Sequence, residues 1–294
     1  MHTLDEYTSK LKPDEIKSST NIVDTCFKSV LSSSIICGHC KNVSKVNEDC
    51  HDLSVPIPSV VSTATLQERV AEFYNREMES YRSHKSEMLN PDKILEQINF
   101  DKRDENDENE VTLMHCMWAF TAKEVLSGEN GYNCEKCSHL DQEEGKRVLR
   151  DATKQLSIQK PAKVLTIHLK RFGHQLYSGK NSLLAHLMQS GGGLRKNSTQ
   201  VTFPKSLELG SFIHPSSPWK NTMCKYRLFG VVEHQGTMNS GHYISFVKQL
   251  QVNKNGEHRR GEWYRISDSH AALSSQLEVL EGSQPYLLMY ELVE

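Results

Sequence analysis

Alternation of apolar and polar positions dominates the C-terminal third of the chain. Short alternating runs follow one another there, separated by connections that hold Gly, Asn, Ser and charged residues. A period of two is typical of half-buried strands. The expected strands are Tyr226–His234, Tyr243–Lys248, Glu262–Ile266 and Tyr286–Glu291, with an earlier one at Lys163–Phe172. Consecutive strands of this kind favour an antiparallel sheet.

A helical period appears in the first half of the chain. Leu113–Leu126 reads as an amphipathic helix, because the apolar residues Met117, Phe120 and Val125 recur at helical intervals. Thr65–Lys85 combines the same period with many good helix formers. Helices that precede a run of strands predict an α+β fold.

Two segments are too polar for a core. Phe100–Glu110 is so densely charged that we expect a loop, and together with Thr65–Lys85 it forms a helical and acidic insertion at 61–110. Ser178–Gln200 contains a Gly-Gly-Gly run and several serines, which predicts a loop insertion at 173–200. A short strand-like run, Asp52–Pro58, lies before the first insertion.

Composition narrows the class of protein. Hydrophobic residues make up 37% and charged residues 24%, and the formal net charge is −2, so no overall basic field draws the chain to nucleic acid or to a membrane. No apolar run approaches the roughly 20 residues that a membrane helix needs. The polar, acidic N-terminus does not resemble a signal peptide, and we expect an intracellular protein, in the nucleus, the cytoplasm or both.

Eight cysteines include two C-x-x-C pairs, Cys37–Cys40 and Cys134–Cys137. A reducing compartment disfavours disulfides, and each pair places two thiolates close enough to share one ion. Zinc takes four such ligands in a closed, structural tetrahedron. The sequence therefore predicts a structural Zn²⁺ held by Cys37, Cys40, Cys134 and Cys137, which would clamp two distant segments together.

Other interpretations of the cysteines stay open at this point. The four thiols are free and buried if the site has lost its metal, and His39 or His139 beside the pairs can replace a ligand. Redox activity is disfavoured because neither pair precedes a βαβ pattern. The remaining cysteines are expected to be buried and inert: Cys26, Cys50, Cys116 and Cys224.

A candidate general base stands between two expected strands. His242 follows a glycine in Asn239–Tyr243, and a histidine at the start of a strand can point into a cleft with little side-chain freedom. About 25 residues later, Ser267 and Asp268 close the next strand, where a polar side chain can hold the imidazole by a hydrogen bond. The alternative is a polar turn that closes a hairpin.

The order of these segments resembles a known family. CGHC, DLSVPIP, YNCEKC, PAKVLTIHLKRF, YRLFGVVEHQGTMNSGHYISFVK, EWYRISDS and PYLLMYE follow one another as the C-terminal boxes of the ubiquitin-specific proteases do. The resemblance runs with interruptions from about Ile22 to Glu291. It implies a partial papain-like catalytic domain of α+β class, with zinc-ribbon fingers and an antiparallel β palm but without the thumb. The fingers would occupy 20–60 and 111–155, and the palm 156–294.

The resemblance also implies roles for single residues. The fingers would grip the body of ubiquitin, whose tail would run along the palm to the active site. His242 matches the catalytic histidine, whereas His234 and Gly236 match a loop that arches over the tail. Ser267 stands where most members carry Asp or Asn. The serine resembles one branch, that of histone-directed and mitochondrial enzymes, and we expect it to orient His242 with Asp268 close behind.

The nucleophile box of the family has no counterpart among these residues. Asp24–Phe27 is superficially similar, but it lacks the Gly-Asn that precedes the cysteine and the Asn that follows it. Phe27 instead fits the hydrophobic position before the first finger cysteines. We therefore reject Cys26 as nucleophile and expect no hydrolysis by this chain alone.

Three functions remain for comparison. The first is a piece of a deubiquitinase that acts on ubiquitinated proteins, and the second is a non-catalytic, zinc-containing ubiquitin-binding module. A zinc ribbon that binds nucleic acid would need basic residues around the cysteine pairs. The nearby residues are instead acidic: Glu48, Asp49, Asp52 and Glu135.

Overall fold

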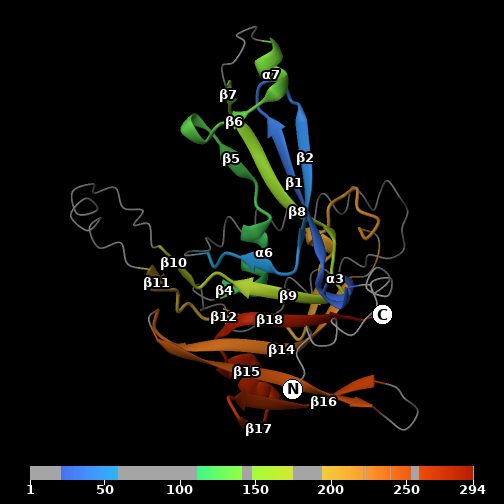
Figure 1. Ribbon diagram of the computed structural model, residues 1–294, viewed down its shortest axis with the longest axis vertical. Helices are drawn as coiled ribbons and strands as arrows, with labels where there is room; N and C mark the ends of the chain where they lie inside the picture. Colours follow the sequence, from blue (N-terminus) through green and yellow to red (C-terminus); the bar gives the residue numbers. More distant parts are fainter. Residues whose placement is uncertain are drawn as a thin grey trace, which may run out of the picture.

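Two sheets, one above the other, organise the molecule (Figure 1). The computed structural model describes residues 21–58, 111–140, 148–174, 194–220, 222, 224–238, 240–252 and 258–293. The expected helix Thr65–Lys85 and loop Phe100–Glu110 lie outside these residues, as does most of the insertion predicted at 173–200.

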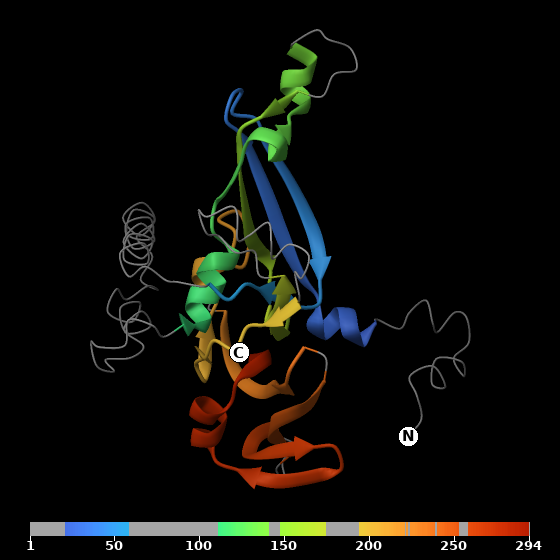
Figure 2. The same cartoon turned by 90° about the vertical axis from the view of Figure 1, so that its left-hand side faces the viewer.

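The upper sheet has four strands in the order β2-β1-β8-β5, all antiparallel. Its strands are β1 (Ser29–Cys37), β2 (Val43–Cys50), β5 (Glu124–Leu126) and β8 (Ala152–Lys160). Its far end carries the 3₁₀ turn η1 (Gly128–Asn130), the strand pair β6 (Tyr132–Asn133) and β7 (Leu149–Arg150), and helix α7 (Glu135–Leu140). We call this part the fingers. It projects away from the rest of the molecule in both views (Figure 2).

The lower sheet, which we call the palm, has eight strands in the order β17-β16-β15-β14-β18-β9-β3, with β13 also paired to β14. They are β3 (Leu53–Val55), β9 (Val164–Leu169), β13 (Ser206–Glu208), β14 (Lys225–Gly236), β15 (Gly241–Val252), β16 (His258–Ser267), β17 (His270–Ser274) and β18 (Pro285–Leu292). All pairs are antiparallel except β3 with β9. The strands predicted from the alternation and the α+β class are confirmed, and β13 and β17 are additions.

Short elements connect and cover the sheets. They are α3 (Ile22–Phe27), β4 (Val111–Thr112), α6 (Leu113–Phe120), β10 (Phe172–His174), β11 (Leu194–Lys196), β12 (Val201–Thr202), η3 (Gly210–Phe212) and the π-helical turn η4 (Glu278–Gly282). β4 pairs in parallel with β12, and β10 pairs with β11 as a small hairpin. No helix in the described part of the chain is long and apolar enough to cross a membrane.

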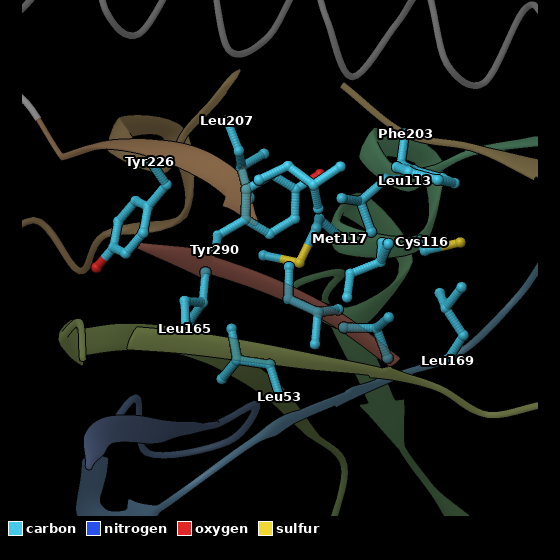
Figure 3. Close-up of a cluster of buried hydrophobic side chains, with 14 of the residues drawn as sticks. Leu53, Leu113, Cys116, Met117, Leu165, Leu169, Phe203, Leu207, Tyr226 and Tyr290 are labelled. Atoms are coloured by element: carbon cyan, nitrogen blue, oxygen red, sulfur yellow. The ribbon is translucent and has the colours of Figure 1, made fainter. Parts of the chain in front are cut away.

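The hydrophobic core lies on one face of the palm (Figure 3). Alternate residues of β9 are fully buried, and Leu113, Cys116 and Met117 of α6 pack over them. Two buried tyrosines keep their hydroxyls satisfied, since Tyr226 donates to the carbonyl of Ala162 and Tyr290 to that of Pro204. Burial of this kind provides most of the stability of a globular fold.

Helix α6 is shorter than the sequence predicts. Thr112 caps it by accepting the amide of His115, and it ends at Phe120 instead of Leu126. Glu124–Leu126 leaves the helix and pairs with β8 as the edge strand β5. Val125, which the helical pattern includes in its apolar stripe, is 73% exposed, so tertiary pairing outweighs the helical period there.

Candidate functional site

Four cysteines meet at the far end of the fingers. Cys37 ends β1, Cys40 follows a tight turn, and Cys134 and Cys137 flank the start of α7. Their sulfur atoms all lie within 4.8 Å of one another, with 3.9 Å between Cys37 and Cys137 and 3.6 Å between Cys40 and Cys134. A tetrahedron with Zn–S bonds of about 2.3 Å has sulfur atoms about 3.8 Å apart. The arrangement therefore fits a zinc ion.

The turn between Cys37 and Cys40 is fixed by backbone contacts. The amide of Gly38 donates to the carbonyl of Asp151 at 2.7 Å, and a Cβ at Gly38 would lie only 2.7 Å from that same oxygen. Lys41 adopts a φ of 58° and donates its ammonium to the carbonyl of Gly38. The first contact holds the turn against the connection between β7 and β8, and the second closes the turn on itself.

The thiols of the cluster differ in how readily they lose a proton. Hydrogen bonds from the backbone of Cys40 lower the pKa of Cys37 to about 7. Burial first, and then the neighbouring thiols, raise the pKa of Cys137 to about 12, while a hydrogen bond from Arg150 acts in the opposite direction. Cys137 also lies 3.6 Å from Nδ1 of His39. A metal bound here would replace the protons of the buried thiols, because cysteine ligates as the thiolate.

The second candidate site joins two strands of the palm. His242 is the second residue of β15, and Ser267 is the last residue of β16. Nε2 of His242 lies 2.8 Å from Oγ of Ser267. Asp268, which is 82% exposed and has a φ of 50°, keeps its carboxylate 3.9 Å from the same nitrogen. The structure thus brings together the three residues that the sequence singled out.

The turn before His242 is tightly built. Gly236 has a φ of 125°, and a Cβ there would lie 2.5 Å from the carbonyl oxygen of Ser240. A Cβ at Gly241 would collide with Nε2 of His234. The His234 side chain is almost fully buried, and burial lowers its pKa, so this histidine fills space beneath the turn.

A cluster of aromatic rings that the sequence did not predict includes His234. Its rings are those of Phe172, His234, Tyr243 and Tyr286, together with His168, at centroid distances of 4.8 to 5.9 Å. Strands far apart in sequence contribute the rings, which is why no local pattern reveals them. Tyr243 is 53% exposed, so the group reaches the surface beside His242.

His168 is held by a chain of hydrogen bonds. Its Nδ1 lies 2.8 Å from Oγ of Ser54, which donates to Asp52 at 2.8 Å. Burial outweighs the attraction of Asp52 and lowers the pKa of His168. The ring is therefore fixed in orientation next to Tyr286.

The profile of the family described as "Ubiquitin carboxyl-terminal hydrolase" matches residues 1–290. The chain belongs to this family. Among curated proteins, a rat protein named ubiquitin carboxyl-terminal hydrolase 16 is 31% identical over 231 residues, which is 70% of this chain and 26% of that protein. A mouse protein named ubiquitin carboxyl-terminal hydrolase 27 is 27% identical over 281 residues, 92% of this chain and 50% of its own length.

Solved structures agree with the family assignment. The SAGA Ubp8 deubiquitinase module bound to ubiquitin aldehyde matches with a TM-score of 0.59 and 26% identity, over 99% of this chain and 46% of that chain. A variant of the same module bound to monoubiquitin matches with a TM-score of 0.60 and 26% identity, over 99% and 45%. The chain thus spans about half the length of these structures and a quarter to a half of the curated relatives above.

Proposed function

We propose that this chain is the ubiquitin-holding and histidine-bearing part of a thiol-dependent deubiquitinase. The complete enzyme would cleave the isopeptide bond that joins the C-terminus of ubiquitin to a protein. The observation that carries the proposal is the 2.8 Å contact between His242 and Ser267 at the ends of two adjacent strands, in a chain of the ubiquitin hydrolase family. The Ubp8 structures, which contain ubiquitin, support the choice of ligand.

The geometry assigns each ring nitrogen of His242 a task. With its proton on Nε2, the ring donates to Oγ of Ser267, and Nδ1 is left as the basic nitrogen. A cysteine thiol facing Nδ1 would lose its proton to the ring, and the thiolate would attack the isopeptide carbonyl. The ring would then protonate the leaving amine, and water would hydrolyse the acyl-enzyme with the ring as base.

Serine is a weak partner for this histidine. A hydroxyl fixes the orientation of the ring, but it brings no negative charge to stabilise an imidazolium. Asp268 supplies a charge 3.9 Å from Nε2, although its exposure to solvent screens that charge. We propose Ser267 as the orienting residue and Asp268 as a secondary one.

We propose that the nucleophilic cysteine lies outside residues 1–294. Cys26 belongs to α3, which packs against β9, and no cysteine of the described ranges makes a hydrogen bond with His242. The second candidate function is a ubiquitin-binding module without catalysis. The two candidates share the binding surface and differ only in whether a thiol joins His242.

We infer that Cys37, Cys40, Cys134 and Cys137 hold a structural zinc ion. The fit of their sulfur spacing to a tetrahedron supports this set. When bound, the ion would tie the end of β1 to the start of α7. No step of the reaction passes through it.

A row of exposed side chains on the fingers is proposed as a contact for ubiquitin. Directly opposed strand residues share one face of a sheet, and the strand register places Val43, Ile36, Thr153 and Val125 side by side across all four strands. Ile36, Val43 and Val125 are exposed. Contiguous exposed apolar side chains mark interaction surfaces. Val46, also exposed, lies on the opposite face.

Titration of the chain with fluorescently labelled ubiquitin tests the binding proposal. We expect a one-to-one complex, at least about tenfold weaker binding for Val125→Asp, and little change for the matched variant Val46→Asp. Ubiquitin that lacks its two C-terminal glycines should also bind more weakly. Absence of any binding by a folded, zinc-loaded chain would refute both candidate functions.

A ubiquitin probe with a C-terminal electrophile separates the two candidates. The chain alone should not be labelled, because we place no nucleophile beside His242. Labelling at Cys26 would overturn the assignment of that residue. In the complete gene product, labelling at a cysteine outside residues 1–294 would establish the enzyme, whereas binding without labelling would establish the module.

A further inference from the structure

The strand pair β10–β11 packs against the turn that precedes His242. β10 and β11 pair antiparallel, and their register places Phe172 directly opposite Lys196. Both residues contact the β14–β15 turn. The ring of Phe172 stands edge-on to that of His234 at a centroid distance of 5.2 Å. The ammonium of Lys196 donates to the carbonyls of His234 at 2.5 Å and Gly236 at 3.2 Å.

Hydrogen bonds of Arg171 join the hairpin to the palm. Arg171, fully buried, donates from Nε to the carbonyl of Pro285 at 2.6 Å and from Nη1 to the carbonyls of Asn197 and Thr199. The amide of Asn197 in turn donates to the carbonyl of Arg171. The base of the hairpin is thereby joined to the start of β18. These hydrogen bonds anchor the hairpin to the palm, and Lys196 contacts the turn from this anchored hairpin.

The described residues of the turn have little room to absorb a change at Lys196. Its two glycines leave no room for added atoms, because Gly236 meets the backbone of Ser240 and Gly241 meets the ring of His234. A hydrogen bond of 2.9 Å from the amide of Thr237 to the carbonyl of Ser240 closes the turn. His242 follows Gly241 directly. A shift of the carbonyls at 234 and 236 would therefore move the backbone that carries the imidazole.

Among the described residues, the ammonium of Lys196 bonds to backbone carbonyls and not to a carboxylate. The charged groups that act on Lys196 are Arg171, which opposes its charge, and Glu233, which favours it; burial acts against the charge more strongly than either, and the pKa of Lys196 is lowered. No carboxylate forms an ion pair with Lys196 among the described residues. The two carbonyl oxygens are thus its main partners, and hydrogen bonds from a charged donor are stronger than those between neutral groups.

We propose that Lys196 is a positioning residue that locks the β14–β15 turn, and through it the orientation of His242 and the surface that receives the ubiquitin tail. The assignment of the tail surface rests on the function proposed above. The locking of the turn does not, because it follows from contacts within this chain. Phe172 acts from the same rung of the hairpin by holding His234 under Gly241.

The experiment compares Lys196→Met with Lys196→Arg and with Lys205→Met, an exposed lysine elsewhere, in the zinc-loaded chain. Amide hydrogen exchange of Thr237 should become about tenfold faster or more in Lys196→Met, as expected when charge-assisted hydrogen bonds are lost. The ¹⁵N signals of the His242 ring should shift, and ubiquitin should bind about tenfold more weakly. Lys196→Arg should restore a large part of each change, and Lys205→Met should change none.

Unchanged turn exchange and unchanged His242 ring signals in Lys196→Met would overturn the proposal. An equal increase in amide hydrogen exchange in β9 and β18 would also overturn it, because that result would show that Lys196→Met destabilises the whole fold and not the turn alone. If Lys196→Met does not fold, Lys196→Gln is judged by the same two measurements. A wild-type chain that fails to bind ubiquitin would refute the proposed function, yet the exchange and ring signals would still decide the role of Lys196.

Discussion

The fingers and the palm are both largely antiparallel sheets, but different interactions hold them. The palm buries a continuous set of large side chains from its strands and from α6. The buried cluster at the far end of the fingers consists of three cysteines, packed by Cys40 and Tyr132. Most of β2 is exposed, with Val43 and Val46 among its exposed residues. A sheet with so little apolar burial needs another source of stability.

Burial of apolar side chains stabilises the palm, whereas the proposed zinc ion would stabilise the fingers. Burial fixes the palm, including the strands that carry His242 and Ser267, and the role proposed for His242 would require placement to within about 0.5 Å. The proposed zinc ion would fix the fingers, which carry the surface proposed to bind ubiquitin. The two regions should therefore respond differently to the same treatment, and most of all to removal of the metal.

Loss of the metal should unfold the fingers and spare the palm. Structural zinc sites contribute about 10 kcal/mol or more of apparent binding free energy. Cys134→Ser or a strong chelator should abolish the content of about one zinc per chain and raise hydrogen exchange in β1 and β2. Exchange in β14 and β18 should change little. Cys26→Ser is the control, and a metal-free chain with equally protected fingers would contradict the division.

A cavity in the palm should have the opposite effect. Leu288, fully buried in the middle of β18, contacts strands on both sides. Leu288→Ala should lower the free energy of unfolding by about 2–5 kcal/mol while zinc content stays at one per chain. Leu273→Ala, at a side chain that is 69% exposed, should change stability by less than about 0.5 kcal/mol. Denaturant unfolding and metal analysis measure the two quantities.

Arg150 is predicted to strengthen zinc binding in the fingers. It lies on β7 and forms a hydrogen bond with Cys137, so its charge offsets that of the ligand set. Arg150→Met should weaken zinc binding about 10–100-fold, as loss of a partner of a metal ligand does. Competition with a chromophoric chelator measures the change, with the exposed Lys136→Met as control. Equal zinc affinity for Arg150→Met and wild type would remove Arg150 from the site.

An ion-pair group in the palm predicts a smaller, pH-dependent effect. Burial acts to raise the pKa of Glu291, but hydrogen bonds from Arg260 at 2.6 Å and Arg227 at 2.8 Å outweigh it and lower the pKa below the ordinary 4.5. A lowered pKa stabilises the fold fully above the unfolded value, and this stability is lost as pH falls through the folded value. Glu291→Gln should therefore cost about 1–2 kcal/mol at pH 7.

That cost should shrink as the pH falls below the ordinary 4.5 and through the lowered pKa of Glu291, where the folded carboxylate becomes protonated. Urea unfolding at several pH values gives the comparison, and Glu262→Gln, an exposed site, serves as control. A cost that is the same at low and at neutral pH would show that the charge of Glu291 contributes nothing.

Local patterns in the sequence predict the strands of the palm, because each alternates over its own length. They do not predict β17, whose residues are almost all exposed, nor the end of α6, where pairing with β8 draws Val125 into a strand. The pairing of Cys37–Cys40 with Cys134–Cys137 follows from ligand chemistry. The contacts of Lys196 and the aromatic group depend on strands distant in sequence, and only the fold brings them together.

Hydrogen exchange of the zinc-loaded chain, measured with and without saturating ubiquitin, tests most directly whether fingers and palm serve one ligand. We predict that a single equivalent of ubiquitin slows exchange both in β1 and β5 of the fingers and in the turn at 235–241 of the palm. Protection of only one of the two regions, or of neither, would contradict the account.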